Sequence, residues 1–133
     1  SVADDSGLIV PAINNEPGLY SARYAGLNAT DSDNRNKLIS KLKDNKLEST
    51  YAYFFCCIVA VGIKGQNEII VCDGKVEGEV RTIERGEKGF GYDPMFYPKG
   101  YSESFAELNS LEKNKISHRG QALKKLMDKL NKT

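Results

Sequence analysis

The sequence predicts one domain of the α/β class, in which helices flank a β-sheet. Residues 51–63 and 68–80 are rich in the β-branched and aromatic residues that are typical of strands. Residues 30–44 and the segment after Ser117 instead repeat their apolar side chains at helical spacing. With 133 residues, 40% of them hydrophobic, the chain is long enough for one core and too short for two ordinary domains. We therefore expect a single domain that spans residues 1–133.

The N-terminal part of the chain predicts a strand, a turn and a helix. Residues 2–4 have a short strand pattern, which we expect to end at a turn around Gly7. Residues 20–26 are typical of a short helical turn or an ordered loop. Residues 30–44 predict a helix with a narrow apolar stripe on an otherwise charged surface. The candidate N-caps of this helix are Thr30, Asp31 and Ser32, and its apolar stripe consists of Leu38, Ile39 and Leu42.

The two long strand patterns are expected to pair with each other. A polar turn at residues 64–67 lies between them, which favours an antiparallel hairpin with both strands in central positions of the sheet. The dipeptide Asp73-Gly74 leaves two alternatives open. It is typical of a second hairpin turn, but it is also compatible with a bulge in one long strand.

The C-terminal part combines a long loop with two helical segments. Residues 81–101 are rich in glycine and proline, and ordered loops of this length usually carry function. Residues 109–116 predict a helical turn. Ser117 is the natural N-cap of the last helix. The apolar stripe of that helix is expected to face the core, and it consists of Leu123, Leu126, Met127 and Leu130.

Charge and cysteine content exclude several functional classes. The chain has 19 basic and 18 acidic residues, so its net charge of +1 offers no basic surface for long DNA or RNA. Its longest apolar run, residues 51–63, is shorter than the ~20 residues of a membrane-spanning helix, so no membrane anchor is expected. Cys56, Cys57 and Cys72 lack the spacing of a disulfide framework or a zinc site. They predict buried thiols in a reducing compartment, and hence a cytoplasmic protein.

A corner rich in hydrogen-bond donors is predicted where the last helix begins. Lys113, Ser117, His118 and Arg119 lie close together in the sequence, beside the free N–H groups and the positive dipole end of that helix. This arrangement suits a phosphate group or a base that carries a carbonyl. The alternative is a capped surface helix with basic residues near its start.

The segment 89–94, which reads Gly-Phe-Gly-Tyr-Asp-Pro, is a second candidate for ligand binding. Its glycines allow the backbone to approach a ligand closely, and Phe90 offers a flat apolar face on which a base can stack. The alternative is a tight glycine turn with a phenylalanine in the core.

The acidic pair Asp4-Asp5 is a third candidate. Adjacent strand residues point to opposite faces, so only one carboxylate need face a cleft. An aspartate there can hold Mg²⁺ and orient a water molecule, which hydrolysis of a phosphoanhydride requires. The alternative is an Asx turn before Gly7. The sequence supports neither a Walker-type phosphate loop, nor a multi-histidine metal site, nor covalent catalysis by Ser6, because it lacks the motifs that these need.

Five segments in a fixed order extend these separate signals. They are residues 3–8, 17–26, 89–94, 105–108 and 117–120, which read ADDSGL, PGLYSARYAG, GFGYDP, FAEL and SHRG. Together they closely resemble the Ham1/RdgB family of inosine and xanthosine triphosphate pyrophosphatases. The resemblance implies an ITPase-like α/β fold with a long, mixed, twisted sheet, flanking helices and two lobes around a nucleotide cleft. It also implies a Mg²⁺-dependent enzyme, commonly a homodimer, that hydrolyses dITP, ITP and XTP to the monophosphate and pyrophosphate.

The same resemblance implies a role for each candidate residue. Asp5 would be the general base and a Mg²⁺ ligand, with Ser6 as a substrate contact beside it. The loop that holds the base and sugar would consist of Phe90, Gly91, Tyr92 and Asp93. The polar contacts around the purine would come from Lys113, His118 and Arg119.

One part of the family pattern is missing from this sequence. The family's first strand, with a Ser/Thr-x-Asn-x-x-Lys phosphate loop, and the acidic metal ligand after it would precede Ser1, so we expect the domain to be incomplete at its N-terminus. Residues 32–37 match the loop pattern literally but lie in a predicted helix and out of order, and we interpret the match as coincidence.

Two alternatives to an active purine nucleotide pyrophosphatase remain. One is a nucleotide-binding fragment without activity, and the other is a Maf-like pyrophosphatase that acts on modified pyrimidine nucleotides.

Overall fold

Helices flank one β-sheet, which confirms the predicted α/β class. The computed structural model describes residues 2–61 and 69–131. The described strands form a five-stranded antiparallel sheet in the order β2-β1-β3-β4-β5. The elements, in chain order, are β1 (Val2–Val10), η1 (Pro11–Ile13), β2 (Glu16–Pro17), η2 (Gly18–Arg23), α1 (Asp31–Asp44), β3 (Ser49–Val61), β4 (Ile69–Arg81), η4 (Asp93–Met95), β5 (Phe96–Pro98), α2 (Ser110–Ile116) and α3 (His118–Asn131).

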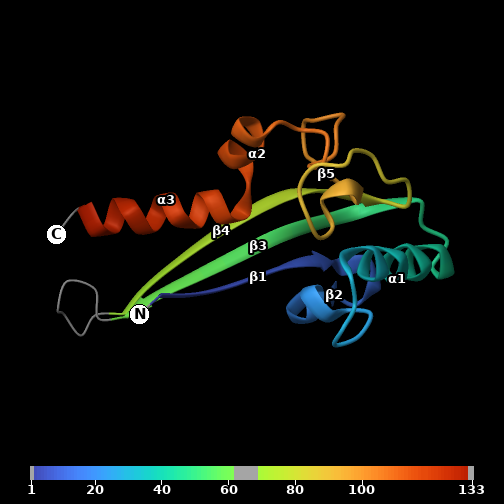
Figure 1. Cartoon of the computed structure of the whole chain (residues 1–133), viewed down its shortest axis with the longest axis horizontal. Helices are drawn as coiled ribbons and strands as arrows, with labels where there is room; N and C mark the ends of the chain where they lie inside the picture. The colour runs from blue at the N-terminus through green and yellow to red at the C-terminus, as the bar shows by residue number, and fades with distance from the viewer. Residues whose placement is uncertain (1, 62–68, 132–133) are drawn as a thin grey trace.

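Two long strands, β3 and β4, dominate the sheet, with α3 running alongside β4 and α1 at the other end (Figure 1). They pair in one continuous register from Ser49 opposite Arg81 to Val61 opposite Ile69. Both alternatives for Asp73-Gly74, a hairpin turn and a bulge, are therefore wrong, because this dipeptide is paired within β4. Both strands do have a neighbour on each side, as predicted. The predicted turn at residues 64–67 lies outside the described residues.

The first strand is longer than its pattern indicated. β1 continues through Gly7 to Val10, so neither the predicted turn nor the alternative Asx turn forms there. The reason is long-range pairing, because β1 forms an antiparallel ladder with β3 that ends at Ile9 opposite Tyr53. Cross-strand pairing overrides a local preference for a turn.

The helix α1 follows its sequence pattern closely. Thr30 is the N-cap, and its side chain accepts a hydrogen bond from the Asp33 N–H while the Asp33 carboxylate accepts one from the Thr30 N–H. This capping box satisfies two of the free N–H groups at the helix start. Leu38 and Leu42 of the predicted stripe are fully buried, and Ile39 is partly buried against the same core.

Ser117 separates the two C-terminal helices and caps α3, as predicted. Its hydroxyl accepts a hydrogen bond from the Gly120 N–H at 3.0 Å. The predicted apolar stripe of α3 is only partly correct, because Leu123 and Met127 are exposed. Leu126 faces the sheet as predicted, together with Ala122. The side chain of Leu130 lies outside the description.

The long loop predicted at residues 81–101 contains two short elements, η4 and β5. The three residues of β5 pair with the last residues of β4. So short a strand, ending in a proline, is below the length at which alternation can be recognised. This is the clearest element that the sequence pattern missed.

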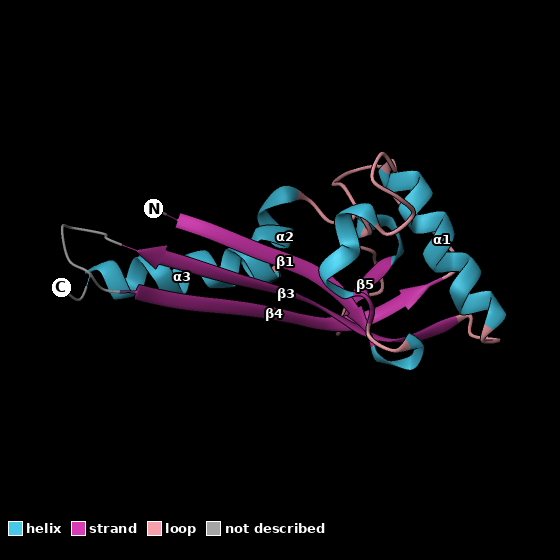
Figure 2. Ribbon diagram, turned by 90° about the horizontal axis from the view of Figure 1, so that it is seen from below, coloured by secondary structure: helices cyan, strands magenta, loops and turns pink. Residues whose placement is uncertain are grey.

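Two hydrophobic clusters pack against the two ends of the sheet. Figure 2 shows the sheet and its flanking helices from below. The larger cluster packs α1 and the loop after β4 against β1, β3 and β4, and it includes Leu8, Phe54 and Phe96. The smaller cluster lies under α3 and includes Cys56 and Cys72. None of the described helices is long and apolar enough to cross a membrane.

Candidate functional site

A cavity of about 400 Å³ opens beside the larger cluster, whose residues Phe54 and Tyr92 line it. Its size is within the range of small-molecule sites. Its lining comes from seven segments of the chain, which extend from β1 to the start of α3. The lining residues are Ser6, Gly7, Ser21, Ala22, Asp31, Asn34, Phe54, Phe90, Gly91, Tyr92, Asp93, Lys113, Asn114, Ser117, His118 and Arg119. Eight of the nine predicted site residues are in this set, and Asp5 is not.

Phe90 presents its ring to solvent at the rim of the cavity. Its side chain is 65% exposed, so the alternative of a phenylalanine in the core is wrong. Gly89 and Gly91 on either side have φ angles of 78° and 61°, which L side chains rarely adopt. Inside the loop, the Asp93 carboxylate accepts a hydrogen bond from the Phe90 N–H at 3.1 Å. The glycines and this bond turn the loop back on itself and leave the Phe90 ring unpacked.

Lys113 joins the two candidate segments. Its Nζ donates to Asp93 Oδ2 at 2.5 Å, and the two side chains are 20% and 7% exposed. The same Nζ lies 4.8 Å from the centroid of the Phe90 ring. An ammonium group has three N–H donors, so the bond to Asp93 leaves others for a ligand. The structure thus places a cationic donor directly beside a flat aromatic surface.

Tyr92 and Ser21 tie this loop to β1. The Tyr92 hydroxyl donates to the Ser21 carbonyl at 2.7 Å. The Ser21 hydroxyl in turn accepts from the Leu8 N–H at 2.9 Å and donates to the Gly18 carbonyl at 2.7 Å. Burial, followed by the nearby Asp31 carboxylate, raises the pKa of Tyr92, so its hydroxyl stays protonated. Tyr92 therefore acts here as a structural donor beneath the cavity.

His118 forms the opposite wall at the start of α3. Its ring stacks on Phe54, with 4.9 Å between the ring centroids and 12° between the planes. Its Nδ1 is buried and has no hydrogen-bond partner among the described residues. Burial lowers the pKa of His118 to about 4, with smaller contributions from the positive charges of Arg119 and Lys113. The imidazole is therefore neutral at pH 7, with one nitrogen that donates and one that accepts.

The lowered pKa of His118 predicts a pH-dependent stability. The unfolded chain protonates this histidine near pH 6.5 but the folded chain only near pH 4. Because the unfolded state binds the extra proton, the free energy of unfolding should fall as pH drops through this window, by about 3 kcal/mol in total. Urea denaturation of the chain and of His118→Gln at several pH values would measure it. Parallel pH profiles for the two proteins would contradict the assignment.

Asp5 lies apart from the other predicted residues. It is exposed and paired with Cys57, whereas Ser6 is paired with Cys56. Alternation along β1 therefore puts Asp5 on the other face of the sheet from the cavity. The described residues contain no group of three side chains able to hold a metal ion. Mg²⁺ needs fewer, because it commonly binds one or two carboxylates together with water and phosphate oxygens, so the Asp5 carboxylate fits as a single hard ligand.

A comparison of the sequence with family models gives a direct result. The model described as the Ham1 family matches residues 1–129. The chain belongs to the Ham1 family. The dITP/XTP pyrophosphatase of Idiomarina loihiensis is 48% identical over 132 residues, which cover 99% of this chain and 65% of that protein. The dITP/XTP pyrophosphatase of Clostridium perfringens is 51% identical over 129 residues, which cover 97% of this chain and 62% of that protein.

Solved structures of Ham1 proteins have the same fold. A Ham1 protein from Coxiella burnetii superposes with a TM-score of 0.91 at 42% identity, covering 99% of this chain and 67% of that one. The Staphylococcus aureus Ham1 protein gives 0.87 at 44% identity, covering 98% of this chain and 66% of that one. The chain spans 62–65% of the length of the two curated relatives named above.

Several cavity residues of this Ham1-family chain were not predicted from the sequence. Asp31 and Asn34 enter from α1, Ser21 and Ala22 from η2, and Phe54 from β3. Asn34 is buried and is held by two hydrogen bonds, from the Ala25 N–H at 2.8 Å and to the Ala22 carbonyl at 3.1 Å. The sequence held only one signal for the role of Asn34, which is its position one helical turn before the buried Leu38. It was insufficient, because most polar residues in such a helix face solvent.

The three cysteines are free thiols, in agreement with the absence of a disulfide pattern. Cys56 and Cys72 are buried as expected, but Cys57 is only partly buried. The difference follows from alternation, because Cys57 points to the face of β3 that α3 does not cover.

Proposed function

We propose that this chain is the base-binding part of an enzyme that hydrolyses dITP, ITP and XTP to the monophosphate and pyrophosphate. The observation that carries the proposal is the Lys113 ammonium group beside the exposed Phe90 ring. The names of the curated relatives, dITP/XTP pyrophosphatase, support it. Such an enzyme would remove deaminated purines from the nucleotide pool.

The chemistry of the cavity suits a purine with a carbonyl at position 6. The base would stack on Phe90, and Lys113 and Arg119 would donate to the carbonyl oxygen, since both side chains are donors only. Adenine carries an amino group there, so donors would face donors. Leaving such groups unpaired costs about 1–3 kcal/mol each, which is enough to reject adenine. Guanine shares the carbonyl, so its exclusion would depend on a contact at its 2-amino group.

Asp5 would supply the hydrolytic chemistry. As a general base it would accept a proton from the attacking water, and it would also hold Mg²⁺, which neutralises charge on the phosphates when it is bound. Because Asp5 faces away from the cavity, the phosphates would pass around the edge of β1. In the described part of the chain β2 is the outer neighbour of β1 and pairs only with Ile9 and Val10, so no strand pairs with β1 beside Ser6.

Pyrophosphate release from dITP, XTP, dGTP and dATP with Mg²⁺ tests the proposed function. We would compare this chain with a form extended at its N-terminus by a phosphate loop and an acidic metal ligand of the family pattern, called the extended form below. We expect the extended form to turn over dITP and XTP, with Asp5→Asn lowering kcat by about 100-fold or more. Unchanged turnover in Asp5→Asn would refute the role of Asp5. Faster turnover of modified pyrimidine triphosphates would favour the Maf-like alternative.

A second candidate function is nucleotide binding without catalysis. The position of Asp5 outside the cavity favours it. Under this alternative, both forms would bind dITP in the presence of Mg²⁺ but neither would release pyrophosphate.

Assembly and compartment complete the proposal. A homodimer is supported by the large apolar side chains that η2 and the segment after it expose, Leu19, Tyr20 and Leu27. A cytoplasmic location is supported by the three free cysteines.

A further inference from the structure

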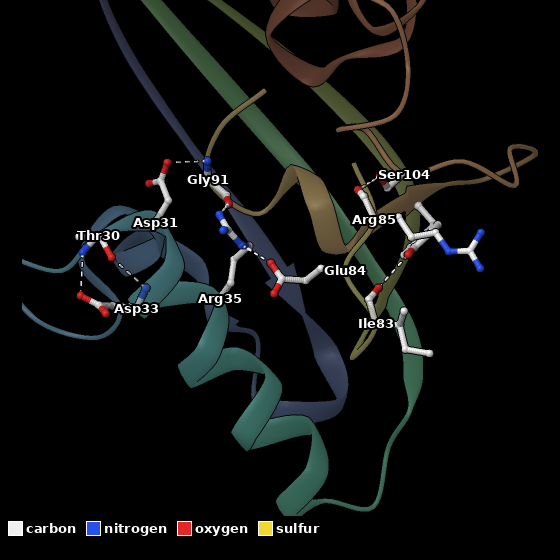
Figure 3. Close-up of polar contacts among 10 residues, drawn as sticks. Thr30, Asp31, Asp33, Arg35, Ile83, Glu84, Arg85, Gly91 and Ser104 are labelled. Carbon is white, nitrogen blue, oxygen red and sulfur yellow. Dashed lines mark hydrogen bonds and ion pairs between the residues drawn. The ribbon is translucent and has the colours of Figure 1, made fainter. Parts of the chain in front are cut away.

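Two residues of α1 hold the peptide groups on both sides of Gly91. The Asp31 carboxylate accepts a hydrogen bond from the Gly91 N–H at 2.9 Å, and Arg35 Nη1 donates to the Gly91 carbonyl at 2.8 Å. Figure 3 shows both contacts reaching from α1 to the loop. Asp31 and Arg35 are four residues apart and therefore lie on the same face of the helix. We call these two residues, together with Glu84, which bonds Arg35, the Gly91 clamp.

Glu84 fixes the direction of the Arg35 side chain. Arg35 Nε donates to the Glu84 carboxylate. Glu84 lies in the segment between β4 and residues 89–93, which we call the Phe90 loop. The guanidinium group thus uses one edge nitrogen for Glu84 and another for the Gly91 carbonyl. Its planar geometry makes these two bonds mutually reinforcing, which a lysine could not reproduce. The Arg35 side chain is only 18% exposed, which limits competition from water.

The Phe90 loop depends on such bonds because its own side chain does not anchor it. Phe90 is 65% exposed, and the glycines on either side of it have wide conformational freedom. Asp93 holds the loop from within, through the Phe90 N–H. The clamp holds it from outside, and it connects the loop to the helix that contributes Asp31 and Asn34 to the cavity wall.

We infer that Asp31 and Arg35 are positioning residues that set the orientation of the Phe90 ring for base binding. The inference rests on the proposed function, since it concerns the same cavity. Neither residue need touch the base for this role. Without the clamp the loop would populate other conformations, and the apparent affinity would fall in proportion to the fraction that remains competent to bind.

Binding of ITP and thermal unfolding of variants of this chain test the inference. Arg35→Ala should weaken ITP binding about tenfold, and Arg35→Lys should recover only part of the loss, because a compact ammonium group on a flexible stem does not reproduce the fixed planar geometry in which the guanidinium meets both partners. Lys43→Ala, which removes an exposed charge from the same helix, is the matched control and should bind ITP normally. At the other contact, Asp31→Ala should weaken ITP binding more than Asp31→Asn, because the asparagine keeps an acceptor oxygen for the Gly91 N–H.

A charge exchange separates positioning from general stability. Arg35→Glu combined with Glu84→Arg restores an ion pair between the two positions, but the carboxylate at position 35 cannot donate to the Gly91 carbonyl. We expect this double variant to regain thermal stability relative to Arg35→Glu without regaining ITP affinity. In the extended form, the defect should appear as a raised KM for ITP with kcat changed by less than about twofold.

The possible outcomes distinguish the inference from the proposed function. If the unmodified chain and the extended form both fail to bind ITP, the proposed function fails, and the inference with it. If the unmodified chain binds ITP and Arg35→Ala binds equally well, the inference alone is refuted. Full recovery of ITP affinity in the charge exchange would also refute it, because stability would then account for the whole effect.

Discussion

Replacing Lys113 with methionine is expected to abolish selective binding of inosine nucleotides and to destabilise the fold. Methionine keeps much of the apolar chain of Lys113 but removes the Nζ donor that bonds Asp93 at 2.5 Å. Asp93 is 7% exposed, so its carboxylate would remain buried without its cation. Breaking a buried ion pair in this way costs about 3 kcal/mol. Loss of the donor to the base should lower the affinity for ITP by about 10- to 100-fold.

Two further variants make this prediction specific. Lys113→Met combined with Asp93→Asn removes the unpaired charge, so it should recover much of the free energy of unfolding but not the affinity for ITP. Lys115→Met is the matched control on the same helix, because the Lys115 side chain is 72% exposed. Urea denaturation and ITP titration of the three proteins provide both measurements. Normal ITP affinity in Lys113→Met would contradict the role of Lys113 in binding the base.

Replacing Gly74 with valine is expected to displace the start of α3. A Cβ atom at this position would overlap the carbonyl oxygen of His118 and the backbone of Ala122. These are helix backbone atoms and cannot rotate away as a side chain can. Overpacking of this kind costs about 3 kcal/mol. The displacement should also disturb the stacking of His118 on Phe54, and ITP affinity should fall with the stability.

Lys75→Val is the matched control for this substitution. It introduces the same side chain one residue further along β4, on the exposed face of the strand, and it removes an exposed ion pair with Glu77 and a cation–π contact with the Tyr53 ring. Such pairs contribute less than about 1 kcal/mol. Gly74→Val and Lys75→Val should therefore differ clearly in their urea midpoints. If they were equally stable, α3 would not depend on the close approach at Gly74.

Local chemistry accounts for the elements that the sequence predicted correctly. A capping box at Thr30 and a serine cap at Ser117 act within one turn of helix, so their patterns can be recognised without the rest of the fold. The long apolar runs of β3 and β4 are similarly unambiguous. The predictions that failed, the turn at Gly7 and the break at Asp73-Gly74, concerned residues whose conformation is set by strand partners far away in the sequence.

The features of the candidate site likewise divide into those that the sequence predicts and those that only the tertiary structure reveals. The ordered motifs, together with Lys113 between the last two of them, identified eight residues that the fold brings to one cavity. The motifs also identified the family, because side-chain chemistry and motif order are written in the chain itself. Only the tertiary structure decided that Phe90 is exposed, that Lys113 bonds Asp93, and that Asp5 faces away from Ser6. It also decided that α1 holds the Phe90 loop through the Gly91 peptide groups. These features depend on contacts between residues 20 to 60 positions apart, which packing and pairing create and no local pattern records.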